Sequence, residues 1–546
     1  MKKLLGILAM LSLLSAGCGK RDKKHSSLKN GERMVNVAIA NPIRSLDPRV
    51  GNEYPSAFAV RVLFEGLLRM GEDGKLFPGM AKSYEISEDK TIYTFHLRDA
   101  KWSNGDQVTA YDFEYAWKKA VNPMFAKTGA FTFYAIKNVK ACFQGKVDVG
   151  EVGVKAINKE TLIVTLEHPA PYFLSLTSCP TFMPINKRID LEKSDWSNNA
   201  DDYFTSNGPF ILGEWKKGDS IILKKNQNYW NAQDVALPGI RILIVENSIT
   251  QFYLFEKGEL DWFGDPLLGT IPPEILKSSQ NRDQIHSQEA FGLYWFFVNT
   301  ESYPFNNKNL RKALAYAINR GQIAEHVLQM GEQPAMGILA DGFNFGNGPY
   351  FEDGNLIKAR QYFELALKEL NLDRNEFPKL VLSIGRTGTS FRLNQAIQQQ
   401  WFEALGIEVE LDQKEWPVHF TTLSEGDYQV GEAQWVSWLY DPIYLLETFR
   451  IKSLSSNMSR WEHPEYRYLL DLSDNELDRD KRLEYLQRAE TVLMEEMPVI
   501  PICFTRVCYM SNPQLKGVYI SPLKELDFRW AYFEGDEPTK NLEASE

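Results

Sequence analysis

The sequence predicts a mixed α/β protein divided into two or three lobes. Its 546 residues are too many for one hydrophobic core, because single cores stop growing at roughly 250–300 residues. Strand-like and helix-like segments both occur, without the strict alternation of a parallel βαβ sheet. After the N-terminal region, no segment reaches the roughly 18 uninterrupted apolar residues that indicate a membrane span.

The first residues have the pattern of a secretory signal. Lys2 and Lys3 precede an apolar run, and small residues lead directly into Cys18, so residues 1–17 are predicted to be a signal peptide. The ending Ser-Ala-Gly-Cys resembles a bacterial lipobox, in which the cysteine is acylated and becomes the first residue of the mature chain. The alternative is an ordinary cleaved signal with an incidental cysteine. With an acylated Cys18, the protein is expected to be periplasmic or otherwise extracytoplasmic, and anchored to the membrane by lipid.

The body of the chain begins after a charged, aperiodic stretch. Residues 18–33 are interpreted as a flexible tether, and the alternating branched residues of 34–40 predict the first strand. Residues 221–225 and 380–384 are also typical of strands. Residues 356–370 place apolar side chains at helical spacing, which predicts a helix.

Composition and charge exclude some classes of function. The chain carries 61 Lys and Arg against 72 Asp and Glu, a formal net charge of −11, which argues against binding to nucleic acid. Aromatic residues make up 13% of the chain, and they suit a wide binding cavity as well as a core. The last residues, 536–546, form an acidic tail.

Four cysteines follow Cys18, an even number that permits disulfides outside the cytoplasm. Cys142 and Cys179 would join residues within one predicted lobe. Cys503 and Cys508 are five apart in a strand-like segment, so they are expected on opposite faces and not bridged to each other. No cysteine or histidine spacing typical of a metal site occurs, and no metal is expected.

The sequence lacks the common catalytic patterns. It contains no GxSxG elbow, HExxH helix, P-loop or GxGxxG turn, and its seven histidines are scattered. We therefore expect a protein that is not an enzyme and needs no cofactor.

A series of segments resembles one family, the oligopeptide-binding lipoproteins of bacterial ABC peptide importers, within the larger peptide/nickel solute-binding family. The resemblance runs from about residue 35 to 530. The segments that carry it are LFEGLL (63–68), PGMAKSYE (78–85), YTFHLRDAKWSNGDQVTAYDFEYAWKK (93–119), NGPF (207–210), NQNYW (226–230) and NLRKALAYAINR (309–320).

This resemblance implies a periplasmic-binding-protein-like fold of the class C type, with two hinged main lobes and a smaller inserted lobe. Lobe one is expected at 34–64, 187–295 and 510–535, lobe two at 65–186 and lobe three at 296–509. Lobes one and three would close over the ligand like a clamp. A peptide backbone would bind between them as an added extended strand.

The resemblance also implies contact residues for the ligand. They come from a lobe-one segment, from an aromatic group near the hinge and from two lobe-three tryptophans that flank side-chain pockets: Asn52, Glu53, Tyr54, Tyr294, Trp295, Phe296, Trp416 and Trp435.

One departure from the family concerns the charged groups that hold peptide ends. Peptide binders usually carry an aspartate three residues after the second tryptophan, and here that position is Trp438. Asp441 matches a later acidic residue that is more often structural. Where an arginine can bind the ligand carboxylate, this chain has Glu432, and Arg386 or Arg392 could supply a replacement. A ligand whose amine is placed differently, such as the γ-linked peptide glutathione, is therefore an alternative to a linear peptide.

The expected partners are a peptide or peptide-like ligand, an ABC permease in the inner membrane and the membrane itself through the lipid anchor, with the protein as a monomer. An extracytoplasmic sensor or adhesin-like lipoprotein that reuses the fold is the second class of function, and an enzyme the third.

Overall fold

The computed structural model describes residues 33–50, 53–125, 130–267, 271–272, 275, 284–386, 388–454 and 456–536. The predicted signal peptide, Cys18 and nearly all of the tether and acidic tail lie outside these residues. None of the helices within the described ranges is both long and apolar enough to cross a bilayer.

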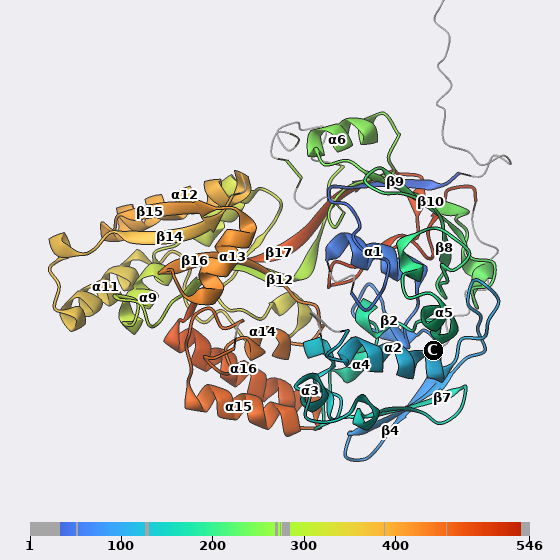
Figure 1. Cartoon of the computed structure of the whole chain (residues 1–546). Helices are drawn as coiled ribbons and strands as arrows, with labels where there is room; N and C mark the ends of the chain where they lie inside the picture. The colour runs from blue at the N-terminus through green and yellow to red at the C-terminus, as the bar shows by residue number, and fades with distance from the viewer. Residues whose placement is uncertain are drawn as a thin grey trace, which may run out of the picture.

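The first sheet has four strands in the order β1 (Val35–Ile39), β10 (Gly239–Ile244), β9 (Ser220–Lys225) and β8 (Phe210–Lys216). β1 pairs with β10 in parallel, and the other pairs are antiparallel. Helices α1 (Tyr54–Leu63), α5 (Lys187–Glu192) and α6 (Ser248–Glu256) belong to the same part of the molecule (Figure 1). The predicted strands at 34–40 and 221–225 are confirmed as β1 and β9.

The second sheet is formed by one continuous stretch of chain. Its antiparallel order is β4 (Ala81–Ile86), β5 (Ile92–Leu97), β7 (Thr161–Thr165) and β6 (Val154–Ala156). Helix α2 (Ala110–Val121) packs on β6 and β7, beside the short helix α3 (Val139–Phe143), and α4 (Phe173–Leu176) packs on β2 (Leu68–Met70). The carboxylate of Asp112 accepts hydrogen bonds from the backbone N–H and the hydroxyl of Thr109, which caps the start of α2. A hairpin of β2 and β3 (Leu76–Pro78) precedes this sheet.

The third sheet is the largest, with seven strands in all. Its path is β11 (Trp262–Gly264), β17 (Val499–Ser511), β12 (His286–Val298), β16 (Val430–Val436), β14 (Leu380–Gly385) and β15 (Val409–Lys414), and β13 (Gln333–Pro334) pairs with β17. The predicted strand at 380–384 is confirmed as β14. Two small two-stranded sheets follow β17: β18 (Leu515–Lys516) pairs with β21 (Tyr532–Phe533), and β19 (Tyr519–Ile520) pairs with β20 (Leu526–Asp527).

Helices surround the outer part of this sheet. They are α9 (Lys308–Tyr316), α10 (Arg320–Ile323), α11 (Leu356–Leu370), α12 (Gly388–Leu405), α13 (Trp416–Glu425), α14 (Ile443–Glu447), α15 (Pro464–Asn475) and α16 (Arg479–Glu496). α11 confirms the helix predicted at 356–370. Asparagine starts several helices, because its side chain accepts a hydrogen bond from an otherwise unpaired N–H of the first turn, as Asn307 does for α9 and Asn355 for α11.

Two long antiparallel strands connect the two main parts of the molecule. β12 and β17 each have 13 residues and pair with each other along most of their length. Figure 1 shows them running between the part that carries α9 and α11–α13 and the part that carries α1 and β8–β10. The main part on the α9 side is therefore joined to the rest through continuous strands.

The cysteines of the described chain form no disulfide. Cys142, Cys179, Cys503 and Cys508 are all free thiols, so the permitted Cys142–Cys179 bridge is not made. Burial raises the pKa of every one of them, to about 12 for Cys179 and about 11 for Cys508. Cys503 and Cys508 both lie in β17, in the strand that their spacing predicts.

Candidate functional site

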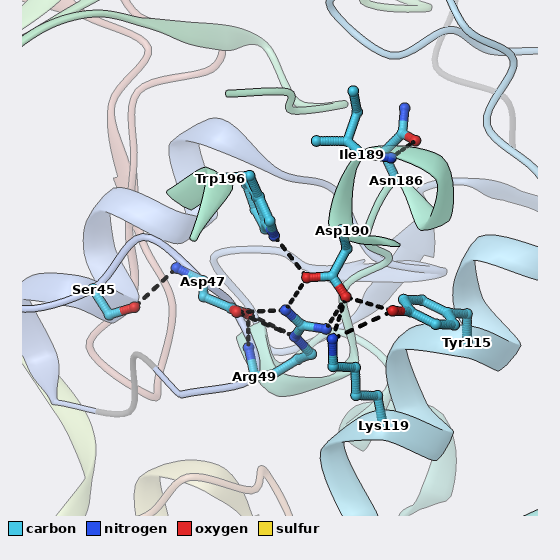
Figure 2. A network of polar contacts seen from close by, with 9 residues as sticks. All are labelled: Ser45, Asp47, Arg49, Tyr115, Lys119, Asn186, Ile189, Asp190 and Trp196. Atoms are coloured by element: carbon cyan, nitrogen blue, oxygen red, sulfur yellow. Dashed lines mark hydrogen bonds and ion pairs between the residues drawn. The ribbon is translucent and has the colours of Figure 1, made fainter. Parts of the chain in front are cut away.

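The loop that leads to α1 is held by a buried network of charges (Figure 2). The guanidinium of Arg49 donates to Asp47 at 2.6 Å and to Asp190 of α5 at 2.8 Å, and these three side chains are almost fully buried. Asp190 accepts three further hydrogen bonds, from the Tyr115 hydroxyl at 2.6 Å, Lys119 Nζ at 2.6 Å and Trp196 Nε1 at 2.9 Å. The network therefore ties the loop to α2 and α5.

Charge complementarity stabilises Asp190 in this network. Burial disfavours its charged form, but the hydrogen bonds and the charge of Arg49, together with Lys119 and Tyr115, outweigh burial and hold the pKa of Asp190 below its usual range. The buried carboxylate of Asp190 thus holds Arg49, and with it the segment 47–49 that precedes α1.

The predicted contact segment at 52–54 begins directly after this loop. Asn52 lies outside the described residues. Glu53 is the residue before α1, and its carboxylate accepts a hydrogen bond from Ser56. Tyr54 is half-buried and donates from its hydroxyl to the backbone oxygen of Lys524 at 3.0 Å, and burial raises the pKa of Tyr54.

The aromatic group predicted near the hinge lies on β12. Trp295 and Phe296 are fully buried: Trp295 packs on Trp435 with ring centroids 6.0 Å apart, and Phe296 on Trp401 at 5.9 Å. Tyr294 is half-buried, and its hydroxyl donates to the carboxylate of Glu432. Within the structure described, Tyr294 is therefore the most accessible member of this group.

Glu432 is the centre of a second polar network, on β16. Its buried carboxylate accepts a hydrogen bond from the backbone N–H of Gly385 at 2.6 Å. The side chains of Tyr294, Ser390 and Asn394 also donate to it. Both oxygens are therefore occupied by donors from β12, β14 and α12, and these hydrogen bonds offset the cost of burying the group.

The lobe-three tryptophans differ in exposure. Trp416, the first residue of α13, is 53% exposed, and Trp438, in the loop after β16, is 50% exposed. Trp435 is half-buried against Trp295. The thiol of Cys179 lies 3.6 Å from the backbone oxygen of Trp438, so this loop meets the segment after α4.

Asp441 and the candidate arginines have different surroundings. Asp441 forms a two-pronged ion pair with Arg482 of α16, with both N–O distances 2.8 Å, and it is buried. Arg392 is exposed on α12, with Nη2 3.4 Å from the hydroxyl of Thr389, and Arg386 pairs with Glu415 on the surface at 3.1 Å.

The structure also brings together residues that the sequence analysis did not select. Arg61 of α1 donates to Glu525, and Tyr54 reaches the neighbouring Lys524. Asp265 lies in the loop after β11, where the backbone N–H of Cys508 is 3.4 Å from its carboxylate. No local pattern marks these residues, because the partners are hundreds of positions apart. The described ranges contain no group of three or more residues arranged to hold a metal ion.

Comparison with known proteins identifies the family. Residues 75–457 match the bacterial extracellular solute-binding proteins, family 5 (middle region). The chain is 41% identical to the oligopeptide-binding protein OppA of Bacillus subtilis over 524 residues, which cover 95% of each chain. It is 34% identical to the dipeptide-binding protein DppE of the same organism over 541 residues, covering 96% of this chain and 98% of the relative.

Solved structures share the architecture. A periplasmic oligopeptide-binding protein of Borrelia burgdorferi superposes with a TM-score of 0.77 at 28% identity, covering 92% of this chain and 99% of the other. The OppA of Haemophilus influenzae, in complex with the peptide RPPGFSPFR, gives 0.75 at 25% identity with the same coverage. The fold is therefore of the periplasmic-binding-protein-like class C type, as the sequence predicts.

Proposed function

Because this chain belongs to the family 5 bacterial extracellular solute-binding proteins, we propose that it captures a peptide or peptide-like ligand and delivers it to an ABC permease. Members of this family bind solutes for transport, and the protein is not an enzyme. The observation that carries the proposal is the 41% identity, over 95% of both chains, to a relative named as an oligopeptide-binding protein.

The proposed motion is closure of two main lobes about β12 and β17. Lobe one would comprise 34–64, 187–295 and 510–535, and lobe three 296–509, with 65–186 as the inserted lobe two. The arrangement of the sheets supports this division, since the second sheet comes entirely from 65–186. In this division lobe two also contacts lobe three, since Lys90 donates to the backbone oxygen of Leu477 and the Cys179 thiol lies 3.6 Å from the backbone oxygen of Trp438.

The proposed ligand surface is largely aromatic. Tyr54, Trp416, Trp435 and Trp438 retain exposed aromatic surface that a ligand can contact. Glu432 and Asp441 have their oxygens occupied by partners within the protein, so in this proposal they shape the site without binding the ligand directly. A ligand with an unusually placed amine, such as a γ-linked peptide, is the second candidate, and Trp438 is the residue that favours it.

The proposed location is outside the cytoplasm, with the chain anchored to the membrane through acylated Cys18. A small-residue stretch directly before Cys18 supports this. The same proposal includes a permease in the inner membrane as partner, because the family delivers solutes to transporters. It also includes a monomeric state for the protein.

Native mass spectrometry and small-angle X-ray scattering test the proposed function together. The protein is mixed with linear tri- to pentapeptides, and captured peptides are identified after release. We expect 1:1 complexes and a smaller radius of gyration on binding. Micromolar binding corresponds to about −8 kcal/mol, which exceeds a gap of a few kcal/mol between open and closed states. Tight binding without any change in scattering would contradict the closure, and no capture of any peptide would contradict peptide binding.

A further inference from the structure

Asp265 is a half-buried carboxylate whose backbone is held by two hydrogen bonds. Its backbone N–H donates to Cys508 O at 2.9 Å, and its backbone oxygen accepts from Trp262 Nε1 at 2.9 Å. Its side chain is half-buried and accepts a long hydrogen bond of 3.4 Å from the N–H of Cys508. No lysine or arginine among the described residues forms an ion pair with it.

The surroundings of Asp265 disfavour an isolated negative charge. Burial raises the pKa of Asp265, and the positive charge of Lys524 acts in the opposite direction. Lys524 Nζ lies 3.3 Å from the backbone oxygen of Arg506. Lys524 and the N–H of Cys508 offset the effect of burial only in part, so a cation that approached Asp265 directly would stabilise its charged form further.

Asp265 also lies close to the proposed ligand surface. Tyr54 contacts Lys524, and the charge of Asp265 contributes to the raised pKa of Tyr54 after burial. Asp265 follows β11, which pairs with β17, one of the two strands that join the main parts. The carboxylate thus lies beside both Tyr54 and the connecting strands.

Other acidic residues near the aromatic surface are already occupied. Glu432 accepts hydrogen bonds from four groups, and Asp441 is held by Arg482. Trp438 offers an indole face, whose attraction for a cation is roughly 0.5–2 kcal/mol. Asp265 differs from these acids because, among the described residues, its carboxylate accepts only the long 3.4 Å hydrogen bond from the N–H of Cys508.

We propose that Asp265 is the carboxylate that pairs with the ammonium group of the ligand, and so determines selectivity for ligands with a free amine. This assignment rests on the proposed function. The pair would be a charge-assisted hydrogen bond between a carboxylate on lobe one and an ammonium held against the aromatic surface. The anchor for the amine would then lie on the opposite lobe from the position of Trp438.

Competitive capture tests the assignment. The purified protein is mixed with equimolar linear tri- to pentapeptides, half with free amines and half N-acetylated, and the captured fraction is quantified by native mass spectrometry. We expect the wild-type protein to prefer the free-amine forms by at least 30-fold, equivalent to about 2 kcal/mol. Asp265→Asn is expected to reduce this preference to less than threefold while still capturing acetylated peptides.

Matched variants separate this role from a general effect on folding. Asp202→Asn, at an exposed aspartate, should keep the wild-type preference, and Asp265→Glu should retain most of it. Asp265→Ser is measured in parallel, with circular dichroism to confirm the fold. Equal capture of both peptide forms by the wild type, or an unchanged preference in Asp265→Asn, would overturn the assignment. Failure of the wild type to capture either form would instead overturn peptide binding itself, and the assignment with it.

Discussion

Replacing Asp190 with asparagine should destabilise the protein substantially. The Asp190 carboxylate accepts five hydrogen bonds, two of them from Arg49, and its side chain is fully buried. Asparagine removes the charge and turns an amide N–H₂ toward these donors. Breaking a buried ion pair costs about 3–5 kcal/mol, and we expect about 3 kcal/mol because Asp47 still pairs with Arg49.

The loss should depend on pH in a definite direction. The pKa of Asp190 is lower in the folded protein than the value of about 3.9 expected for an unfolded chain. Its contribution to stability is therefore complete above that value and is lost as the pH falls through the folded pKa. The difference in unfolding free energy between wild type and Asp190→Asn should be constant from about pH 5 to 7 and smaller at pH 3.

Urea unfolding followed by circular dichroism measures this difference at pH 7 and pH 3. The control is Asp202→Asn, an exposed substitution that should change stability by no more than about 0.5 kcal/mol. A loss below about 1 kcal/mol at pH 7, the range of a surface ion pair, would refute the reasoning. A loss that is equally large at pH 3 would refute the electrostatic part of it.

Two further predictions concern Glu432 and Cys18. Glu432→Gln should lower the free energy of unfolding by about 2 kcal/mol. The reason is that the glutamine N–H₂ would face a hydrogen-bond donor, in a site where four donors converge on the carboxylate. An unchanged unfolding transition in differential scanning calorimetry would contradict this. Cys18→Ser should abolish incorporation of labelled palmitate and move the protein to the soluble fraction, while undiminished labelling of the variant would show that the acyl chain is attached elsewhere.

Single strands and helices can be predicted from the sequence, because the side-chain pattern that produces each of them lies within one short segment. The alternation of branched residues in β1 and the helical spacing of α11 each lie within one short segment. The family resemblance supplied the arrangement of these elements, which no single segment determines. Side-chain patterns therefore predicted elements, and only comparison over the whole chain predicted the fold.

The site was less predictable because its state depends on distant partners. The family resemblance predicts residues 294–296 as one contact group, but the structure buries Trp295 against Trp435 and Phe296 against Trp401, and within the group Tyr294 alone keeps exposed surface. The sequence shows that Glu432 is acidic, but not that donors from three other elements occupy it. For Asp265 the informative feature is that no lysine or arginine in the described ranges pairs with it, which only three-dimensional structure can reveal.

The buried thiols have a consequence for how the chain survives outside the cytoplasm. The thiolate is the nucleophile in disulfide chemistry, and burial raises the pKa of the Cys508 thiol to about 11, so that it is almost entirely protonated at pH 7. The folded protein is therefore a poor substrate for oxidation, whereas its unfolded chain presents several ordinary thiols. Rapid folding after export then acts as chemical protection, since Cys142, Cys503 and Cys508 become buried. A more stable fold therefore also protects these thiols better from oxidation, because the chain spends less time unfolded.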